Sequence, residues 1–367
     1  MKIIILCLLH IDELPPLMTN LKVLSKKYDV LYIGVDDGTN YIDLFNNKVK
    51  FINLIKDKHT PSISNQRIRD HIDRKLFDYY VKKANSIIES NCKNGDLIWV
   101  HHEFSLLKID RINLPYYLTM YELHDDLFKK DNELKQRIRM ARKVIVPEYT
   151  RSAIVQACVG LKELPYVIPN KPYDYDDKST KLDNNPIDSI VEDAHKSGKK
   201  IILYSGIFLR ERKLEPFIEA IENLRDKFVF VLIGRKSEYL EELLNKYPNI
   251  KYLGFYNPPQ HMSIIKKSDI GILTYVADNG SINSVFCAPN KIWEYSKYGI
   301  PMLCNDIPGL KYTVEYGGFG YCCDINSTES IISVLNKIND NYGELSKNAY
   351  KFYETIDIEK TILNVIQ

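Results

Sequence analysis

Apolar residues occur along the chain in short continuous runs separated by longer segments with helical spacing. In the first half, two segments with helical spacing are clearest, Leu17–Lys27 and Gln66–Ser90. Because apolar runs that alternate with helices are typical of parallel sheets covered on both faces, this pattern predicts an α/β fold. The runs that predict its strands are residues 2–9, 29–35, 49–55, 96–102, 116–123 and 143–147.

The second half repeats the scheme, with helical spacing in Leu214–Lys227 and Tyr239–Lys246. Two such units in series predict two Rossmann-like domains. We expect an N-terminal domain over 1–170, a C-terminal domain over 171–349, and a C-terminal helix over 350–367 that could return to the first domain. The polar stretch 171–197 is expected to be a linker with one short helix. The strand runs of this half are 199–206, 228–234, 250–255, 269–275, 300–305 and 317–323.

Composition narrows the class of protein. A chain of 367 residues with a net charge of +2 lacks the dense basic stripe of a nucleic-acid binder. No apolar run approaches the ~18 residues that span a bilayer, and the short run Ile3–Leu9 lacks the cleavage site of a signal peptide. Seven scattered cysteines without a C-x-x-C pair favour a reduced, cytoplasmic compartment. A mild basic excess in the first half leaves contact with an anionic membrane surface open, beside the simpler interpretation of a mixed solvated surface.

Polar clusters follow two of the predicted strands in the first half. His101, His102 and Glu103 come after one strand, and the segment 122–126 (ELHDD) comes after the next. Ligands bind at the carboxyl ends of parallel strands, so both clusters are candidates for chemistry. Each could equally be a polar loop with a helix-capping aspartate. A zinc site is a weaker interpretation, because the ligand spacing is not compact and no cysteine joins it.

A basic loop follows the first predicted strand of the second half. Gly206 allows close backbone approach, and Arg210, Arg212 and Lys213 precede a helix, where cations suit a pyrophosphate. The alternative is an ordinary solvated loop. The chain contains no G-x-G-x-x-G or Walker A sequence, which argues against a dinucleotide dehydrogenase or a P-loop ATPase.

A lone carboxylate, Glu294, lies in the apolar stretch 287–299 (CAPNKIWEYSKYG). Pro289 suits the opening of a helix, and Lys291 lies three residues before Glu294 on nearly the same face. If that face lines a ligand site, the carboxylate could accept hydrogen bonds from two ribose hydroxyls. The alternative is a lysine–glutamate surface pair, with Ile292 and Trp293 forming the buried face.

Several of these segments together resemble a known family. YSG, FIEAI, KYLGF, SDIGILTY and PNKIWEYSKYGIPMLCNDIPG look like the C-terminal domain of GT-B glycosyltransferases, most similar to glycosyltransferase family 4. The resemblance implies two Rossmann-like domains whose parallel sheets face each other across a cleft. Gly206, Arg212 and Ala220 keep the family's spacing, which implies that Arg212 binds the donor diphosphate. Glu294 matches the second glutamate of the family's E-x7-E element, which binds the donor ribose.

The first half resembles the family more loosely. YELHDDLF is similar to its His-Asp element, which implies that His124 faces the donor sugar with Asp125 beside it. The catalytic residues implied are thus His124, Arg212 and Asp125. The donor-binding residues implied are Gly206, Arg212, Lys213, Asn283, Asn290, Lys291 and Glu294.

Two departures from the family pattern bear on the reaction. Phe286 stands where the first glutamate of E-x7-E is expected, and Asn283 or Ser284 could serve in its place. The segment HIDELPP replaces the glycine-rich loop after the first strand. Asp12 and Glu13 in that segment could supply a general base for an inverting reaction.

The resemblance implies a hexosyltransferase-like enzyme that moves a sugar from a nucleotide-diphosphate-sugar to a glycan or lipid-linked acceptor. It points to bacterial surface polysaccharide synthesis with retention of configuration, and to no metal or other cofactor. We expect a cytoplasmic protein, with peripheral contact to the inner face of the membrane left open. The alternatives are a sugar-nucleotide epimerase of the same fold and a degenerate GT-B binding module, the latter favoured by Phe286.

Overall fold

The computed structural model describes the chain except for residues 12–13, 37–44, 46–47, 55–65, 109–111, 113, 174–179 and 277–279, and the side chains of 66–74, 76–77 and 80–81. The chain forms two compact units. Unit 1 consists of Met1–Tyr173 together with Ile358–Gln367, and unit 2 is Asp174–Asp357. The general-base candidates Asp12 and Glu13 lie outside the described residues.

Unit 1 is built on a sheet of seven described strands in the order β3-β2-β1-β4-β5-β6-β7, and every pairing in it is parallel. The six strands predicted for this half are all present, and the two-residue strand β7 is an addition. The strands are β1 (Lys2–Cys7), β2 (Asp29–Gly34), β3 (Val49–Asn53), β4 (Leu97–His101), β5 (Tyr116–Thr119), β6 (Lys143–Val146) and β7 (Tyr166–Val167). Its helices are α1 (Pro15–Lys27), α2 (Gln66–Asn91), α3 (Glu103–Lys108), α4 (Glu133–Met140), α5 (Tyr149–Val159) and α15 (Ile358–Ile366).

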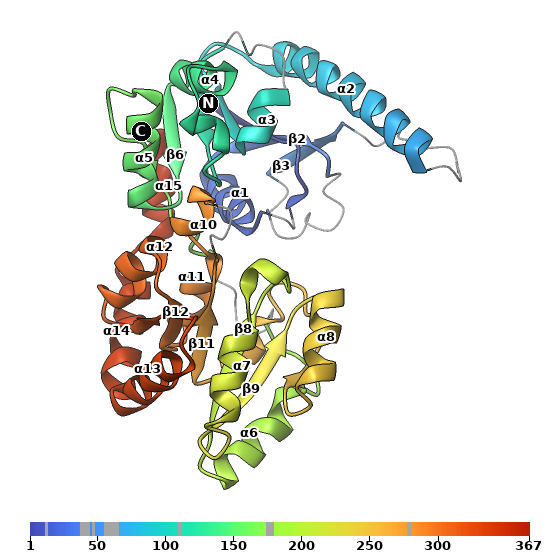
Figure 1. Cartoon of the computed structure of the whole chain (residues 1–367). Coiled ribbons are helices and arrows are strands. Elements are labelled where there is room, and N and C mark those ends of the chain that lie inside the picture. Colours follow the sequence, from blue (N-terminus) through green and yellow to red (C-terminus); the bar gives the residue numbers. More distant parts are fainter. Residues whose placement is uncertain are drawn as a thin grey trace. The chain divides into compact units, whose positions relative to one another are not determined.

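Unit 2 is built on a sheet of six described strands in the order β10-β9-β8-β11-β12-β13, again all parallel (Figure 1). The strands are β8 (Lys200–Ser205), β9 (Phe228–Ile233), β10 (Lys251–Tyr252), β11 (Ile270–Leu273), β12 (Met302–Asn305) and β13 (Gly320–Cys323). Its helices are α6 (Ile187–Lys196), α7 (Glu215–Glu222), α8 (Glu238–Lys246), α9 (Met262–Ile265), α10 (Ile282–Val285), α11 (Asn290–Ser296), α12 (Pro308–Leu310), α13 (Thr328–Asp340) and α14 (Tyr342–Glu354).

Both faces of the second sheet are covered, which explains the continuous apolar runs. On β8, Ile202 and Tyr204 join a buried cluster with α7 and α13, whereas Ile201 and Leu203 join another with α6, α9 and α11. A strand buried on both faces needs apolar residues at every position rather than at alternate ones. The prediction of two α/β units with parallel sheets is therefore confirmed.

The C-terminal segment differs from the single helix expected over 350–367. Helix α14 ends at Glu354, and α15 begins at Ile358 after a short break. Ile358, Ile362, Leu363 and Val365 of α15 join the core of unit 1 with the apolar residues of α1. The Lys143 Nζ also donates to the Val365 carbonyl at 2.6 Å. Among the described residues, no helix combines the length and apolarity needed to cross a membrane.

Candidate functional site

A cavity of about 200 Å³ opens at the carboxyl ends of β8 and β11 in unit 2. Four of the residues expected to bind the donor line it together, although they come from two separate parts of the sequence. Its position outside the strand ends is the usual ligand site of an open parallel sheet. The lining residues are Tyr204, Ser205, Gly206, Ile207, Arg212, Ile272, Leu273, Thr274, Tyr275, Asn290 and Lys291.

Arg212 is held in this cavity by the end of β11. Its guanidinium lies 3.9 Å from the centre of the Tyr275 ring, and its Nη1 donates to the Thr274 carbonyl at 3.4 Å. In return, the Thr274 hydroxyl donates to the Arg212 carbonyl at 3.0 Å. A guanidinium stacked on an aromatic ring keeps most of its N–H donors available in the ring plane, so it suits binding of a phosphate group.

Asn305, at the end of β12, fixes the backbone of Tyr275. Its side chain accepts from the Tyr275 N–H and donates to the Tyr275 carbonyl, both at 3.0 Å. Asn305 is only 4% exposed, so this pair of bonds is shielded from water. Asn305 therefore positions the ring on which Arg212 rests.

The loop at Gly206 after β8 and the turn at Gly234 after β9 lie against each other. Gly206 donates its N–H to the Ile233 carbonyl at 3.0 Å. A Cβ added at Gly234, whose φ is +154°, would lie 2.0 Å from the Gly206 carbonyl oxygen. Any side chain at Gly234 would push the Gly206 loop out of place, so glycine there keeps the cavity wall in position.

Glu294 lies on α11 next to the cavity, and it is 7% exposed. Its Oε2 accepts from the Lys291 Nζ at 2.8 Å, and the His261 Nε2 lies 3.2 Å from the same oxygen. Burial raises the pKa of Glu294, but the nearby Lys291 and His261 outweigh it and lower this pKa to about 2. The lysine–glutamate pair weighed in the sequence thus exists, but its carboxylate is buried and ionised rather than exposed.

His261 was missed by sequence reasoning. It precedes the short helix α9, which packs on α11, and its side chain is 8% exposed. Its Nδ1 is buried and has no hydrogen-bond partner among the described residues. Because His261 is more than 30 positions from Glu294, no local spacing could indicate their contact.

The comparison with known families bears directly on this unit. Residues 188–353 match the family model described as "Glycosyl transferases group 1". Unit 2 carries a glycosyltransferase domain. This match confirms the expectation that the chain is a glycosyltransferase. A search of curated proteins found no match to the chain in sequence.

Solved structures resemble the whole glycosyltransferase chain in fold. Anabaena Alr3699/HepE in complex with UDP has a TM-score of 0.68 at 16% identity, with 100% of this chain and 98% of that chain covered. Sucrose-phosphate synthase from Thermosynechococcus elongatus has a TM-score of 0.70 at 14% identity, with 100% of this chain and 97% of that chain covered. WaaG, a glycosyltransferase involved in lipopolysaccharide biosynthesis, has a TM-score of 0.62 at 12% identity, with 99% of this chain and 98% of that chain covered. At such identities the likeness shows the fold alone, and it confirms the expected GT-B class.

Not every residue expected to bind the donor of the glycosyltransferase lines the cavity. Lys213 adopts a left-handed conformation with φ +40°, where it ends the turn Arg210–Arg212. Asn283 and Phe286 lie on and directly after α10, which Ser281 caps through its side chain. None of these three residues is among the lining residues of the cavity in the described part of the chain.

In unit 1, His124 caps a short turn at the carboxyl end of β5. Its Nδ1 accepts from the Asp126 N–H at 3.2 Å, and its side chain is 44% exposed. The Asp126 carboxylate lies 3.5 Å from the same nitrogen, whereas Asp125 is exposed. The histidine, rather than an aspartate, therefore caps this turn by accepting from the Asp126 N–H.

In the His101–Glu103 cluster at the end of β4, His101 and Glu103 are buried and His102 is half-buried. His101 Nδ1 lies 2.8 Å from the Tyr121 hydroxyl, and burial lowers the pKa of His101 to about 3. His102 has φ +76°, and its Nε2 lies 3.6 Å from Glu103 Oε1. Glu103 is 2% exposed, and burial raises its pKa to about 8. In the described ranges no group of three or more His, Cys, Asp or Glu side chains could hold a metal ion.

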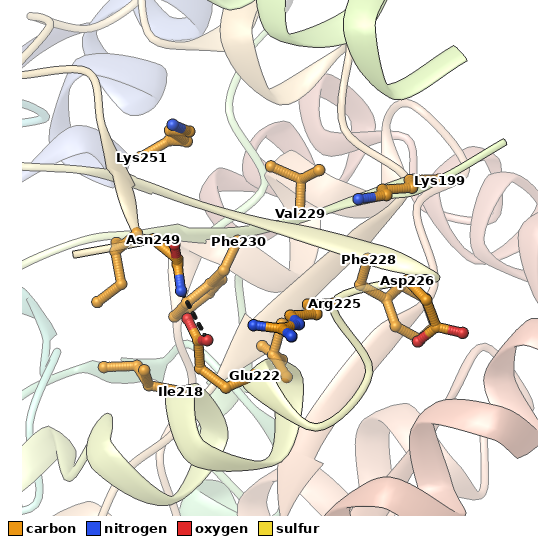
Figure 2. Close-up of a pocket in the computed structure, with 12 residues that line it drawn as sticks. Lys199, Ile218, Glu222, Arg225, Asp226, Phe228, Val229, Phe230, Asn249 and Lys251 are labelled. Atoms are coloured by element: carbon orange, nitrogen blue, oxygen red, sulfur yellow. Dashed lines mark hydrogen bonds between the residues drawn. The ribbon is translucent and has the colours of Figure 1, made fainter. Parts of the chain in front are cut away.

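A larger cavity of about 420 Å³ lies at the amino ends of β8, β9 and β10 in the glycosyltransferase domain (Figure 2). Lys199, Phe228 and Lys251 mark these strand starts, and Glu222 accepts from the Asn249 amide at 2.9 Å across it. Ligands of open parallel sheets bind at the opposite end of the strands. This cavity is therefore not the candidate active site.

Proposed function

We propose that this chain transfers a sugar from a nucleoside-diphosphate-sugar donor, with the donor held in the cavity at the carboxyl ends of β8 and β11. The observation that carries the proposal is the meeting of two cations, Arg212 and Lys291, in one cavity beside the ionised Glu294. Two cations suit a diphosphate, and a buried carboxylate suits ribose hydroxyls. The structural neighbour from Anabaena, solved with UDP, supports this choice of donor.

The proposed chemistry is departure of the nucleoside diphosphate from the sugar. Arg212 and Lys291 stabilise the negative charge that develops on the leaving phosphate. Glu294 orients the donor through its ribose. Gly206 and Asn290 contact the donor from the wall of the cavity, whereas donor contacts of Lys213 and Asn283 stay predictions.

We assign the sugar end of the reaction to unit 1. His124 donates a hydrogen bond to a hydroxyl of the donor sugar, with Asp125 beside it, and configuration is retained. The acceptor is a glycan or lipid-linked saccharide of bacterial surface polysaccharide, in line with the role of the neighbour WaaG in lipopolysaccharide biosynthesis. The enzyme acts without a metal or other cofactor. Its cysteines are thiols rather than disulfides, which supports a cytoplasmic location, including the inner face of the membrane.

A panel of nucleotide sugars tests the proposal. Thermal shift identifies the donor that stabilises the protein, and chromatography then follows that donor without an acceptor. Slow release of free sugar and nucleoside diphosphate is the expected result. Conversion of the donor into an isomeric sugar nucleotide would instead indicate an epimerase, and binding without any turnover would indicate a binding module.

Glu294→Gln provides the matching test of the site. Replacing the carboxylate by an amide removes a charge-assisted hydrogen bond, worth about 1.5–3 kcal/mol. We expect the nucleotide affinity measured by calorimetry to fall roughly ten- to a hundredfold. Glu241→Gln on the exposed face of α8 is the control. An affinity within twofold of wild type in a folded Glu294→Gln protein would remove Glu294 from the donor site.

A further inference from the structure

Two nitrogen groups share one oxygen of Glu294. The Lys291 Nζ lies 2.8 Å from Oε2, and the His261 Nε2 lies 3.2 Å from the same atom. In the described part of the chain neither group bonds to Oε1, so that oxygen is the one that can accept from a ligand. Lys291 and His261 therefore occupy Oε2 and leave Oε1 as an available acceptor.

Lys291 and His261 differ in what their side chains can reach. The side chain of Lys291 is 22% exposed and lines the cavity with Arg212, so its ammonium can turn toward a phosphate. The side chain of His261 is 8% exposed and is not among the residues that line the cavity, so it cannot turn toward a phosphate there. When a donor diphosphate draws Lys291 away, a buried carboxylate without a second partner would take up a proton.

We propose that His261 is the positioning residue of the donor site: it holds Glu294 ionised and oriented while Lys291 moves from the carboxylate to the donor phosphates. This inference rests on the proposed function. The Nε2 of His261 donates to Oε2 in either charge state of the ring. The Nδ1 of His261 is buried and has no hydrogen-bond partner among the described residues, so Nε2 is the ring atom through which His261 acts.

Substitutions of His261 separate hydrogen-bond donation from packing. His261→Leu removes the donor, whereas the longer amide of His261→Gln can still reach Oε2. His195, an exposed histidine on α6 of the same unit, gives the matched control variants His195→Leu and His195→Gln. His261→Asn, whose amide is too short to reach, replaces the leucine variant if that variant does not fold.

Nucleotide binding is the first measurement, with UDP, ADP and GDP as probes and the one that binds wild type most tightly carried forward. We expect His261→Leu to weaken that nucleotide by at least tenfold and His261→Gln by less than threefold. Both His195 variants should bind as wild type does. Equal affinity of His261→Leu and His195→Leu would overturn the role of His261.

The second measurement does not need a nucleotide. Carbon-13 NMR of the labelled Glu294 carboxyl group reports its titration directly. We expect its midpoint to rise by at least one pH unit in His261→Leu and to stay near the wild-type value in His261→Gln. An unchanged midpoint in folded His261→Leu also overturns the inference. If wild type binds none of the three nucleotides, the proposed function fails, and this titration still decides for or against His261.

Discussion

Glu294 and Glu103 are both buried, yet their neighbours give them opposite charge states. Lys291 and His261 contact the carboxylate of Glu294 and bring its pKa down to about 2 despite burial. Among the described residues no lysine or arginine pairs with Glu103, and burial raises its pKa to about 8. At neutral pH the first carboxyl group is therefore ionised and the second is mostly protonated.

The raised pKa of Glu103 predicts a pH-dependent stability. Its pKa moves from 4.5 in the unfolded chain to about 8 in the folded one, so its contribution is complete below pH 4.5 and is lost as pH rises through 8. That loss is on the order of 3–5 kcal/mol. We expect Glu103→Gln to be more stable than wild type in urea at pH 8.5 and equally stable at pH 4.5. The same gain in Glu133→Gln, an exposed control on α4, would contradict this account.

Arg212 offers a test of leaving-group stabilisation. Arg212→Ala removes a cation from the cavity, and loss of one such stabiliser costs on the order of a hundredfold or more in rate. We expect turnover of the donor to fall by at least this factor, while affinity for the bare nucleoside changes little. Arg210→Ala is the matched control, because Arg210 is exposed and pairs with Glu242. Near-normal turnover in Arg212→Ala would remove this residue from the mechanism.

At the scale of elements, the ends of neighbouring strands set the geometry of the cavity. Asn305 ends β12, and its amide bonds to both backbone groups of Tyr275, just beyond the end of β11. Tyr275 in turn stacks on Arg212. Asn305 contacts Tyr275, and Tyr275 contacts Arg212. A substitution of Asn305 should therefore displace Arg212, although Asn305 itself is not among the residues that line the cavity.

Asn305→Ala should therefore affect both stability and turnover. It leaves a buried N–H and a buried carbonyl without their partner, which costs about 1–3 kcal/mol of unfolding free energy. We expect donor turnover to fall by at least tenfold because Tyr275 and Arg212 shift. The control is Asn249→Ala, at the amino ends of the strands, which should leave turnover unchanged. Wild-type turnover in Asn305→Ala would show that Arg212 does not depend on this clamp.

The sequence predicted well those strands that are buried on both faces. It predicted poorly those residue contacts whose partners lie far apart in the sequence. Apolar strands such as β8 stand out because both faces are packed, whereas the two-residue strand β7 has too few residues to form a pattern. Glu294 could be predicted as a site residue because helix spacing and family likeness meet at one position. His261 and Asn305 were not found, because their partners are about 30 residues away and only packing brings them together.

At the scale of the whole molecule, unit 1 is discontinuous. Helix α15 follows the last helix of unit 2 in sequence but belongs to the core of unit 1. Its buried face carries Ile362, which is fully buried, and the opposite face carries the exposed Asn364. The stability of unit 1 therefore depends on residues beyond unit 2.

Ile362→Ala tests this dependence. Removing a fully buried isoleucine side chain to alanine costs about 2–5 kcal/mol. We expect calorimetry to show a lower-temperature transition for unit 1 and an unchanged transition for unit 2. Asn364→Ala on the exposed face of the same helix should leave both transitions in place. A shift of the unit 2 transition with Ile362→Ala would show that α15 does not serve unit 1 alone.

The return of α15 also fixes an order of events during synthesis. As the ribosome makes the chain, every residue of unit 2 has been joined once Asp357 is added, and only then does α15 emerge. The apolar surface of α1 that α15 covers stays open to solvent throughout that interval. Unit 2 can complete its fold before unit 1, which reverses the usual N-terminal-first sequence and makes the nascent first unit the part of the chain most in need of a chaperone.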